Sequence, residues 1–121
     1  MPEIQNSKRY DLEERTYQFA KNVVIFCKNL PKNASNVEYV RQVIRSSGSV
    51  GANYIEANES LSKKDFVMRM KICRKEAKES TYWLRLIVET NSEEYRVEGE
   101  ILLKETVELK KILSAILEKS K

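Results

Sequence analysis

Apolar side chains recur every three or four residues along nearly the whole chain, in four runs that short polar segments separate. This spacing places them on one face of an α-helix, and no segment shows the period-two alternation of a half-buried strand. Four helices joined by short turns favour an antiparallel up-down-up-down bundle. We therefore expect an all-α protein with a single domain over residues 1–121 and helices at about 8–30, 36–58, 63–90 and 93–119.

The polar segments carry the signals that start and stop helices. Asp11 and Glu14 have the spacing of a capping box, so Asp11 is the expected cap of the first helix. Pro31 ends that helix, and the pattern resumes near residue 37. Ser62 and Ser92 are the expected caps of the third and fourth helices.

Composition narrows the chemistry that this chain can carry. Histidine is absent, which removes the commonest metal ligand and excludes Ser-His-Asp and Cys-His catalytic arrangements. Cys27 and Cys73 lie far apart in apolar helical stripes, which favours two free buried thiols, with a disulfide or a metal site as the alternative. We expect no catalytic activity, no cofactor and no bound metal.

The distribution of apolar residues bears on location and assembly. No run approaches the roughly 18 apolar residues of a membrane span, and the first residues lack the apolar section of a secretory signal. We therefore expect a soluble, cytoplasmic protein without a membrane partner. Apolar residues such as Tyr17, Val24 and Ile101 exceed what one stripe per helix requires, and this surplus predicts self-association.

Residues 46–57, SSGSVGANYIEA, place two of the three glycines inside the second helical run. A P-loop, a dinucleotide fingerprint and a nucleophile elbow are all excluded, because the lysine, the preceding strand and the G-x-S-x-G order are missing. Small residues four apart instead make one helix face nearly flat, so that a neighbouring backbone can approach closely. The predicted interface residues are Ser47, Gly48, Gly51, Ala52, Asn53 and Glu56. Asn53 and Glu56 either hydrogen-bond across a helix or subunit interface or are solvated.

The run from Arg45 to Phe66, RSSGSVGANYIEANESLSKKDF, resembles part of a known family. It is similar to the second helix of four-helix-bundle proteins encoded in intervening sequences of bacterial large-subunit ribosomal RNA genes, where the stretch reads approximately R-x-A-x-S-I-P-A-N-I-A-E-G. The matching positions of this chain are Arg45, Ser49, Val50, Ala52, Asn53 and Glu56, with Glu79, Trp83 and Leu84 matching the third helix.

The resemblance implies a homo-oligomer, and in particular a homopentameric ring of bundles. A relative in diversity-generating retroelements is a basic pentamer that associates with a reverse transcriptase and with nucleic acid. For most members of the family no activity is assigned. The candidate partners are therefore further copies of this chain, RNA or DNA, and a reverse transcriptase or another protein.

Basic residues concentrate in the third helical run, where residues 63–85 include eight Lys or Arg and only three Asp or Glu. Six residues separated by 7, 4, 3, 4 and 3 positions share one helical face, and they are Lys64, Lys71, Lys75, Lys78, Tyr82 and Arg85. Such a face can follow a phosphate backbone and stack a base without reading sequence. The alternative is a solvated face on which Lys75 pairs with Glu79, four residues further on.

Trp83 adjoins Tyr82 and therefore points in another direction, which favours an anchor in the core or an interface over a stacking role. Taken together, these patterns predict a non-enzymatic, oligomeric scaffold or accessory protein that associates with nucleic acid through the basic face. The competing hypothesis is a protein-interaction module whose ring binds a protein partner without nucleic acid.

Overall fold

The computed structural model describes the backbone of residues 2–121 and the side chains from Asp11 onward. Four α-helices account for most of the chain, namely α1 (Pro2–Lys28), α2 (Ala34–Asn58), α3 (Lys63–Thr90) and α4 (Arg96–Lys119), with a 3₁₀ helix, η1 (Glu93–Tyr95), before α4. Residues 2–121 contain no strand, which confirms the all-α prediction. None of the described helices is long and apolar enough to span a bilayer.

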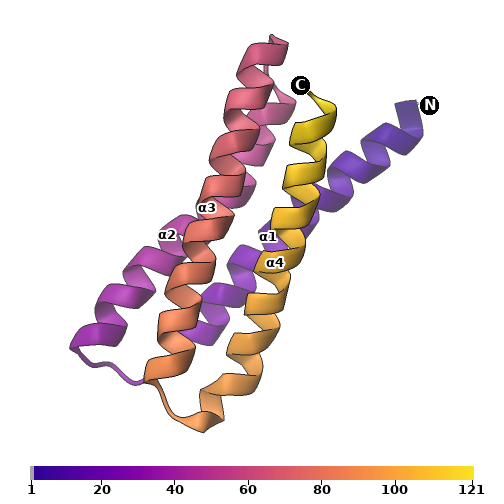
Figure 1. Cartoon of the computed structure of the whole chain (residues 1–121). Helices are drawn as coiled ribbons and strands as arrows, with labels where there is room; N and C mark the ends of the chain where they lie inside the picture. Colours follow the sequence, from indigo (N-terminus) through magenta and orange to yellow (C-terminus); the bar gives the residue numbers. More distant parts are fainter. Residues whose placement is uncertain (1) are drawn as a thin grey trace.

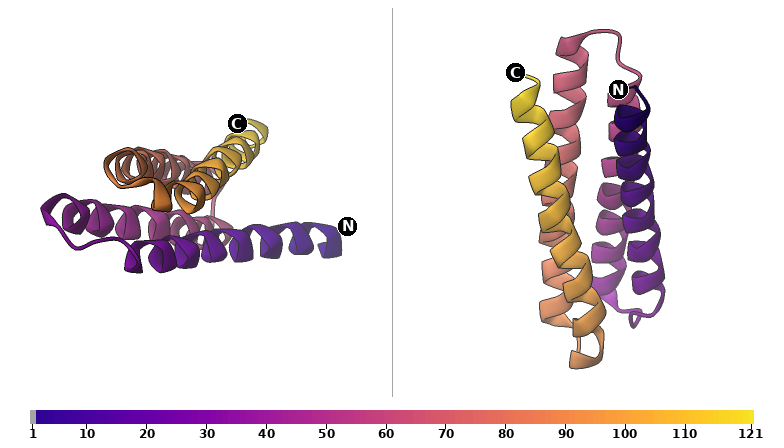
Figure 2. Two further views of the ribbon diagram at one scale, coloured as in Figure 1. Left: turned by 90° about the horizontal axis from the view of Figure 1, so that it is seen from below. Right: turned by 90° about the vertical axis from the view of Figure 1, so that its right-hand side faces the viewer.

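The helices form two layers, with α1 and α2 in one and α3 and α4 in the other (Figures 1 and 2). Helices that follow one another in sequence lie side by side, and the chain's two ends emerge at the same end of the bundle. α2 packs most extensively against α3, whereas α1 makes few contacts with α4. α1 is inclined to α4 and leads away from it toward the N-terminus (Figure 1). The pair α2 and α3 is therefore tightly packed, whereas the pair α1 and α4 is loosely packed.

Two helices begin earlier than the sequence predicts. α1 begins at Pro2, so Asp11 lies inside the helix and does not cap it. Proline suits the first helical turn, because the N–H that it lacks would have no intrahelical partner there. α2 begins at Ala34 instead of near Val37, because the side chain of Asn33 caps it by accepting a hydrogen bond from a backbone N–H of the first turn.

The predicted serine caps differ in outcome. Ser62 caps α3, since its side-chain oxygen accepts a hydrogen bond from the backbone N–H of Asp65 at 3.1 Å. Ser92 makes no cap hydrogen bond, and its hydroxyl donates instead to the carboxylate of Glu94 at 3.2 Å. The 3₁₀ turn between Ser92 and α4 explains this failure, because it separates the serine from the first free N–H groups of the α-helix.

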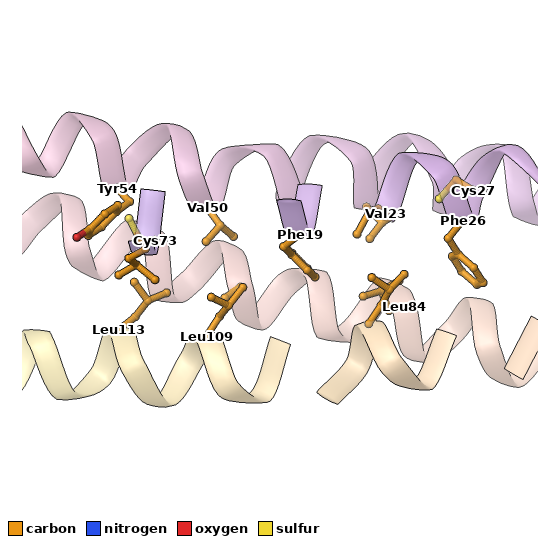
Figure 3. Packing of buried hydrophobic residues seen from close by; sticks show 14 of the residues in the cluster. Phe19, Val23, Phe26, Cys27, Val50, Tyr54, Cys73, Leu84, Leu109 and Leu113 are labelled. Atoms are coloured by element: carbon orange, nitrogen blue, oxygen red, sulfur yellow. The ribbon is translucent and has the colours of Figure 1, made fainter. Parts of the chain in front are cut away.

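The core lies between the two layers. Figure 3 shows apolar side chains from all four helices pointing into the space between them, among them Phe19, Val50, Leu84 and Leu109. Each of these four is at most 2% exposed, and burying such a side chain contributes about 1.5–3 kcal/mol to folding. The segment 46–57 is helical throughout, as predicted, and contributes Val50 to this core.

Two glycines mark close approaches between helices. A Cβ atom at Gly51 would lie 2.9 Å from the side-chain oxygen of Thr16 on α1, and one at Gly99 would overlap the side chain of Val88 on α3. The missing side chains therefore allow these helices to pack closely. Gly48 differs, because a Cβ atom there would meet nothing within 4 Å.

Candidate nucleic-acid interface

The outer face of α3 carries the basic residues that the sequence analysis singled out. The six predicted residues are all exposed, and they are Lys64, Lys71, Lys75, Lys78, Tyr82 and Arg85, which we call the basic face. The opposite side of the same helix is buried, with Met70, Cys73, Ala77 and Leu84 in the core. Helical periodicity thus separates the charged residues from the core along about six turns of α3.

Two acidic residues of α3 are held by a neighbouring helix. Glu76 and Glu79 both form ion pairs with Arg45 of α2, and the Arg45 Nη2 to Glu76 Oε1 distance is 3.3 Å. The hydrogen bond to Glu76 raises the pKa of Arg45 above its ordinary value, and attraction to both carboxylates adds to the effect. Glu79 therefore pairs with Arg45, and the alternative pair of Lys75 with Glu79 does not form.

The ammonium groups of the basic face are free of internal partners. Among the side chains that the structure describes, none of its four lysines forms an ion pair or a side-chain hydrogen bond. Arg85 pairs with Glu89 at 3.0 Å, but both side chains are largely exposed. Exposed pairs of this kind contribute less than about 1 kcal/mol, so a phosphate can displace the carboxylate. The face can therefore offer its positive charges to an external polyanion.

An aromatic cluster lies beside these charges. The ring of Tyr82 meets that of Trp83 edge to face, with centroids 5.0 Å apart and planes at 84°. Trp83 in turn contacts Tyr39 of α2, with centroids 6.0 Å apart. Trp83 is half-buried against the core, as predicted for an anchor, and its indole N–H has no acceptor among the described residues. The exposed ring of Tyr82 is thus connected through Trp83 to the core.

The predicted interface residues do not all face the same way. Ser47 and Gly51 are buried inside the bundle, whereas Gly48, Ala52 and Glu56 are exposed. The buried pair thus belongs to packing within one chain. A subunit contact at the three exposed residues stays a prediction.

Asn53, the remaining member of that predicted set, connects two helices. Its side-chain oxygen accepts a hydrogen bond from Arg69 of α3 at 3.1 Å, while its amide donates to the Ser49 carbonyl at 2.9 Å. Asn53 thus hydrogen-bonds across a helix interface within the chain, one of the two arrangements that the sequence left open.

A groove separates α1 from α4 on another side of the molecule. It has a volume of about 320 Å³, and Phe19 and Leu102 contribute to its apolar lining. Ile101, at its edge, is 61% exposed. Arg15 and Glu105 connect the two helices through two hydrogen bonds of 2.8 Å. Charged side chains such as Lys104 and Glu108 also line the groove.

The cysteines are free and buried, as predicted. Burial raises the pKa of Cys27 to about 11 and that of Cys73 to about 12. Both thiols are therefore protonated at neutral pH. Only the deprotonated form, the thiolate, acts as a nucleophile or a metal ligand. The described residues contain no group of three or more His, Cys, Asp or Glu that could hold a metal ion.

Sequence reasoning missed two parts of this region. The pairing of Arg45 with two glutamates of α3 was not predicted, although Glu76 and Glu79 are three residues apart and so lie on one flank of the helix. The contact of Tyr39 with Trp83 left no signal in the sequence, because it depends on how α2 and α3 are aligned.

Known proteins resemble this chain in sequence and in fold. A family model described as the 23S rRNA-intervening sequence protein matches residues 8–115. A crystal structure of a protein with unknown function, from the S23 ribosomal protein family of Bacteroides thetaiotaomicron VPI-5482, matches with a TM-score of 0.73 and 29% sequence identity. That match covers 87% of this chain and 96% of the other. No curated protein matches the sequence. Since the family model spans nearly the whole chain, this protein belongs to the 23S rRNA-intervening sequence protein family.

Proposed function

We propose that this protein is a non-enzymatic scaffold that assembles into a ring of antiparallel up-down-up-down bundles and associates with nucleic acid through the basic face of α3. The four exposed, unpaired lysines of that face carry the proposal. Among the described side chains, Glu76 and Glu79 pair with Arg45 and not with these lysines. A phosphate backbone is the ligand that such a face attracts, without discrimination between sequences.

Exposed apolar residues of α2 support the assembly of several copies. Val37, Ile44 and Ile55 are exposed, and with Gly48 they are separated by 7, 4 and 7 positions, so they share one helix face. A second copy packed against this face would bury those side chains, and the bare backbone of Gly48 would allow a close approach. In a ring, the basic face would recur on every subunit, and weak phosphate contacts would add up through avidity.

Sedimentation velocity of the purified protein, alone and with a short RNA, tests both parts of the proposal. We expect an oligomer that sediments with RNA at low salt and releases it at high salt. A variant with Lys71, Lys75 and Lys78 changed to Ala should bind far more weakly, and its salt dependence, the slope of log K against log salt, should fall by about 2. A clean monomer would refute the ring, and an oligomer indifferent to RNA at both salt concentrations would refute the nucleic-acid role.

A matched control is available on another surface. Lys21, Lys28 and Lys32 are also exposed and lie on or just after α1. Changing these three to Ala removes the same net charge from a different face. Binding that weakens equally in both triple variants would contradict a site on α3, because it would reflect net charge alone.

The groove between α1 and α4 favours a second candidate function, that of a protein-interaction module. Its apolar lining and the exposed Ile101 suit an apolar segment of a partner protein. Such a contact would resist high salt, whereas a phosphate contact would not. Complexes that survive high salt and are lost on Ile101→Glu would support this alternative.

A further inference from the structure

The basic face contains one aromatic ring among its charges. Tyr82 is 60% exposed and lies four residues after Lys78 and three before Arg85, so all three share the outer side of α3. We propose that the basic face binds single-stranded rather than duplex nucleic acid, with one unpaired base stacked on the ring of Tyr82. This inference rests on the proposed function and specifies its ligand.

The surroundings of Tyr82 hold its ring ready for stacking. Trp83 lies edge to face against it at 5.0 Å, and Trp83 is itself wedged between the core and Tyr39. A ring that already has a packed neighbour loses little conformational freedom when a base stacks on its open side. An isolated exposed tyrosine would lack this support.

The chemistry of the face distinguishes the two forms of nucleic acid. Lysines at positions 71, 75 and 78 can contact the phosphates of either form, so charge alone does not discriminate between them. A tyrosine ring needs the open face of a base, which a duplex conceals within its stack and a single strand exposes. From Lys71 to Arg85 the helix extends about 21 Å at 1.5 Å per residue, enough for a strand of several nucleotides.

Binding measurements with matched strands and duplexes test this inference. The probes are a labelled strand of about 12 nucleotides without self-complementarity, as RNA and as DNA, and the corresponding duplexes. Dissociation constants come from fluorescence anisotropy, and quenching of Trp83, the only tryptophan, reports events beside Tyr82. The variants are Tyr82→Ala and Tyr82→Phe, with Tyr17→Ala as control, since Tyr17 is 61% exposed on α1.

We expect the single strand to bind about tenfold more tightly than the duplex and to quench Trp83. Tyr82→Ala should lose this preference, whereas Tyr82→Phe and Tyr17→Ala should keep it, because stacking needs the ring and not the hydroxyl. The strand that binds more tightly identifies the sugar of the ligand.

Equal binding of strand and duplex, unchanged by Tyr82→Ala, would overturn the stacking inference and leave the proposed function standing. Absence of binding to every probe would overturn both. A loss of affinity for the strand in Tyr17→Ala as large as in Tyr82→Ala would also contradict a base site on α3.

Discussion

The two sides of the bundle are held together in different ways. Between α2 and α3 the packing is the most extensive in the molecule, and the hydroxyls of Ser46 and Ser80 form a buried hydrogen bond of 2.8 Å. Between α1 and α4 contacts are few, and the Arg15–Glu105 pair connects the helices beside an apolar groove. The helix with the basic face thus belongs to the tightly packed side, while the loosely packed side leaves Ile101 exposed beside the groove.

Truncating one side chain on each side should give the largest contrast. Leu84 of α3 is fully buried, so Leu84→Ala should lower the free energy of unfolding by about 2–5 kcal/mol through lost burial and a cavity. Ile101 of α4 is 61% exposed, so Ile101→Ala should change it by less than about 0.5 kcal/mol. Urea unfolding measures both values. Similar losses of unfolding free energy in the two variants would show that Ile101 is buried in solution, for instance by a second copy of the chain.

Removing the arginine from each ion pair should give a smaller contrast. Arg45→Ala leaves the carboxylate of Glu76, whose side chain is only 10% exposed, without its partner. This change should lower the free energy of unfolding by about 1–3 kcal/mol. Arg15→Ala should cost less than about 1 kcal/mol, because its pair with Glu105 remains accessible to water.

Nucleic-acid affinity provides an independent readout of the same two variants. Arg45→Ala releases Glu79, which lies four residues after Lys75, and should therefore weaken RNA binding, whereas Arg15→Ala should leave it unchanged. Both affinities follow from salt titrations with the labelled strand. Tighter binding in Arg45→Ala would contradict the role assigned to Arg45.

The buried thiols predict the smallest effect, which depends on pH. Burial raises the pKa of Cys73 from 9.0 to about 12, so below pH 9 the thiol is protonated in both states and contributes no pH dependence. Between pH 9 and 12 the unfolded chain releases the proton first, so stability falls as pH rises. At pH 10 the Cys73 thiol contributes about 1 kcal/mol of this loss, and Cys73→Ala should remove that contribution while the similar one of Cys27 remains.

Comparison of urea unfolding at pH 8 and pH 10, within each variant, isolates that component from the cost of the substitution. Cys27 on α1 gives the matching test for the open side, since its pKa is raised to about 11. A single-thiol variant that keeps Cys27 should also react faster with a thiol reagent than one that keeps Cys73. The reason is that α1 has fewer contacts with the other helices than α3, so that local unfolding exposes its thiol more often. Equal rates would show that the two sides open together.

Much of the candidate site was predictable because it lies on one helix. The exposed face from Lys64 to Arg85, the unbroken helix through 46–57 and the cap at Ser62 all follow from positions a few residues apart. The caps expected at Asp11 and Ser92 failed for a related reason, since each required the boundary of the helix to be known in advance.

Relations between helices were beyond such reasoning. Within α3, Glu79 has the right spacing to pair with Lys75, yet it pairs with Arg45 because α2 brings a guanidinium to that flank. Gly48 and Gly51 belong to one small-residue segment, but α1 covers Gly51 and leaves Gly48 bare. In both cases the outcome depends on which helix is the neighbour and at what register.

The sequence by itself determined four helices, their buried stripes and a basic outer face on α3, because helical periodicity acts over a few residues. Only the tertiary structure decided that Arg45 pairs with Glu76 and Glu79, that Tyr39 packs against Trp83, and that α1 and α4 make few contacts. Each of these depends on contacts between residues far apart in the chain, and no local pattern encodes the alignment of two helices.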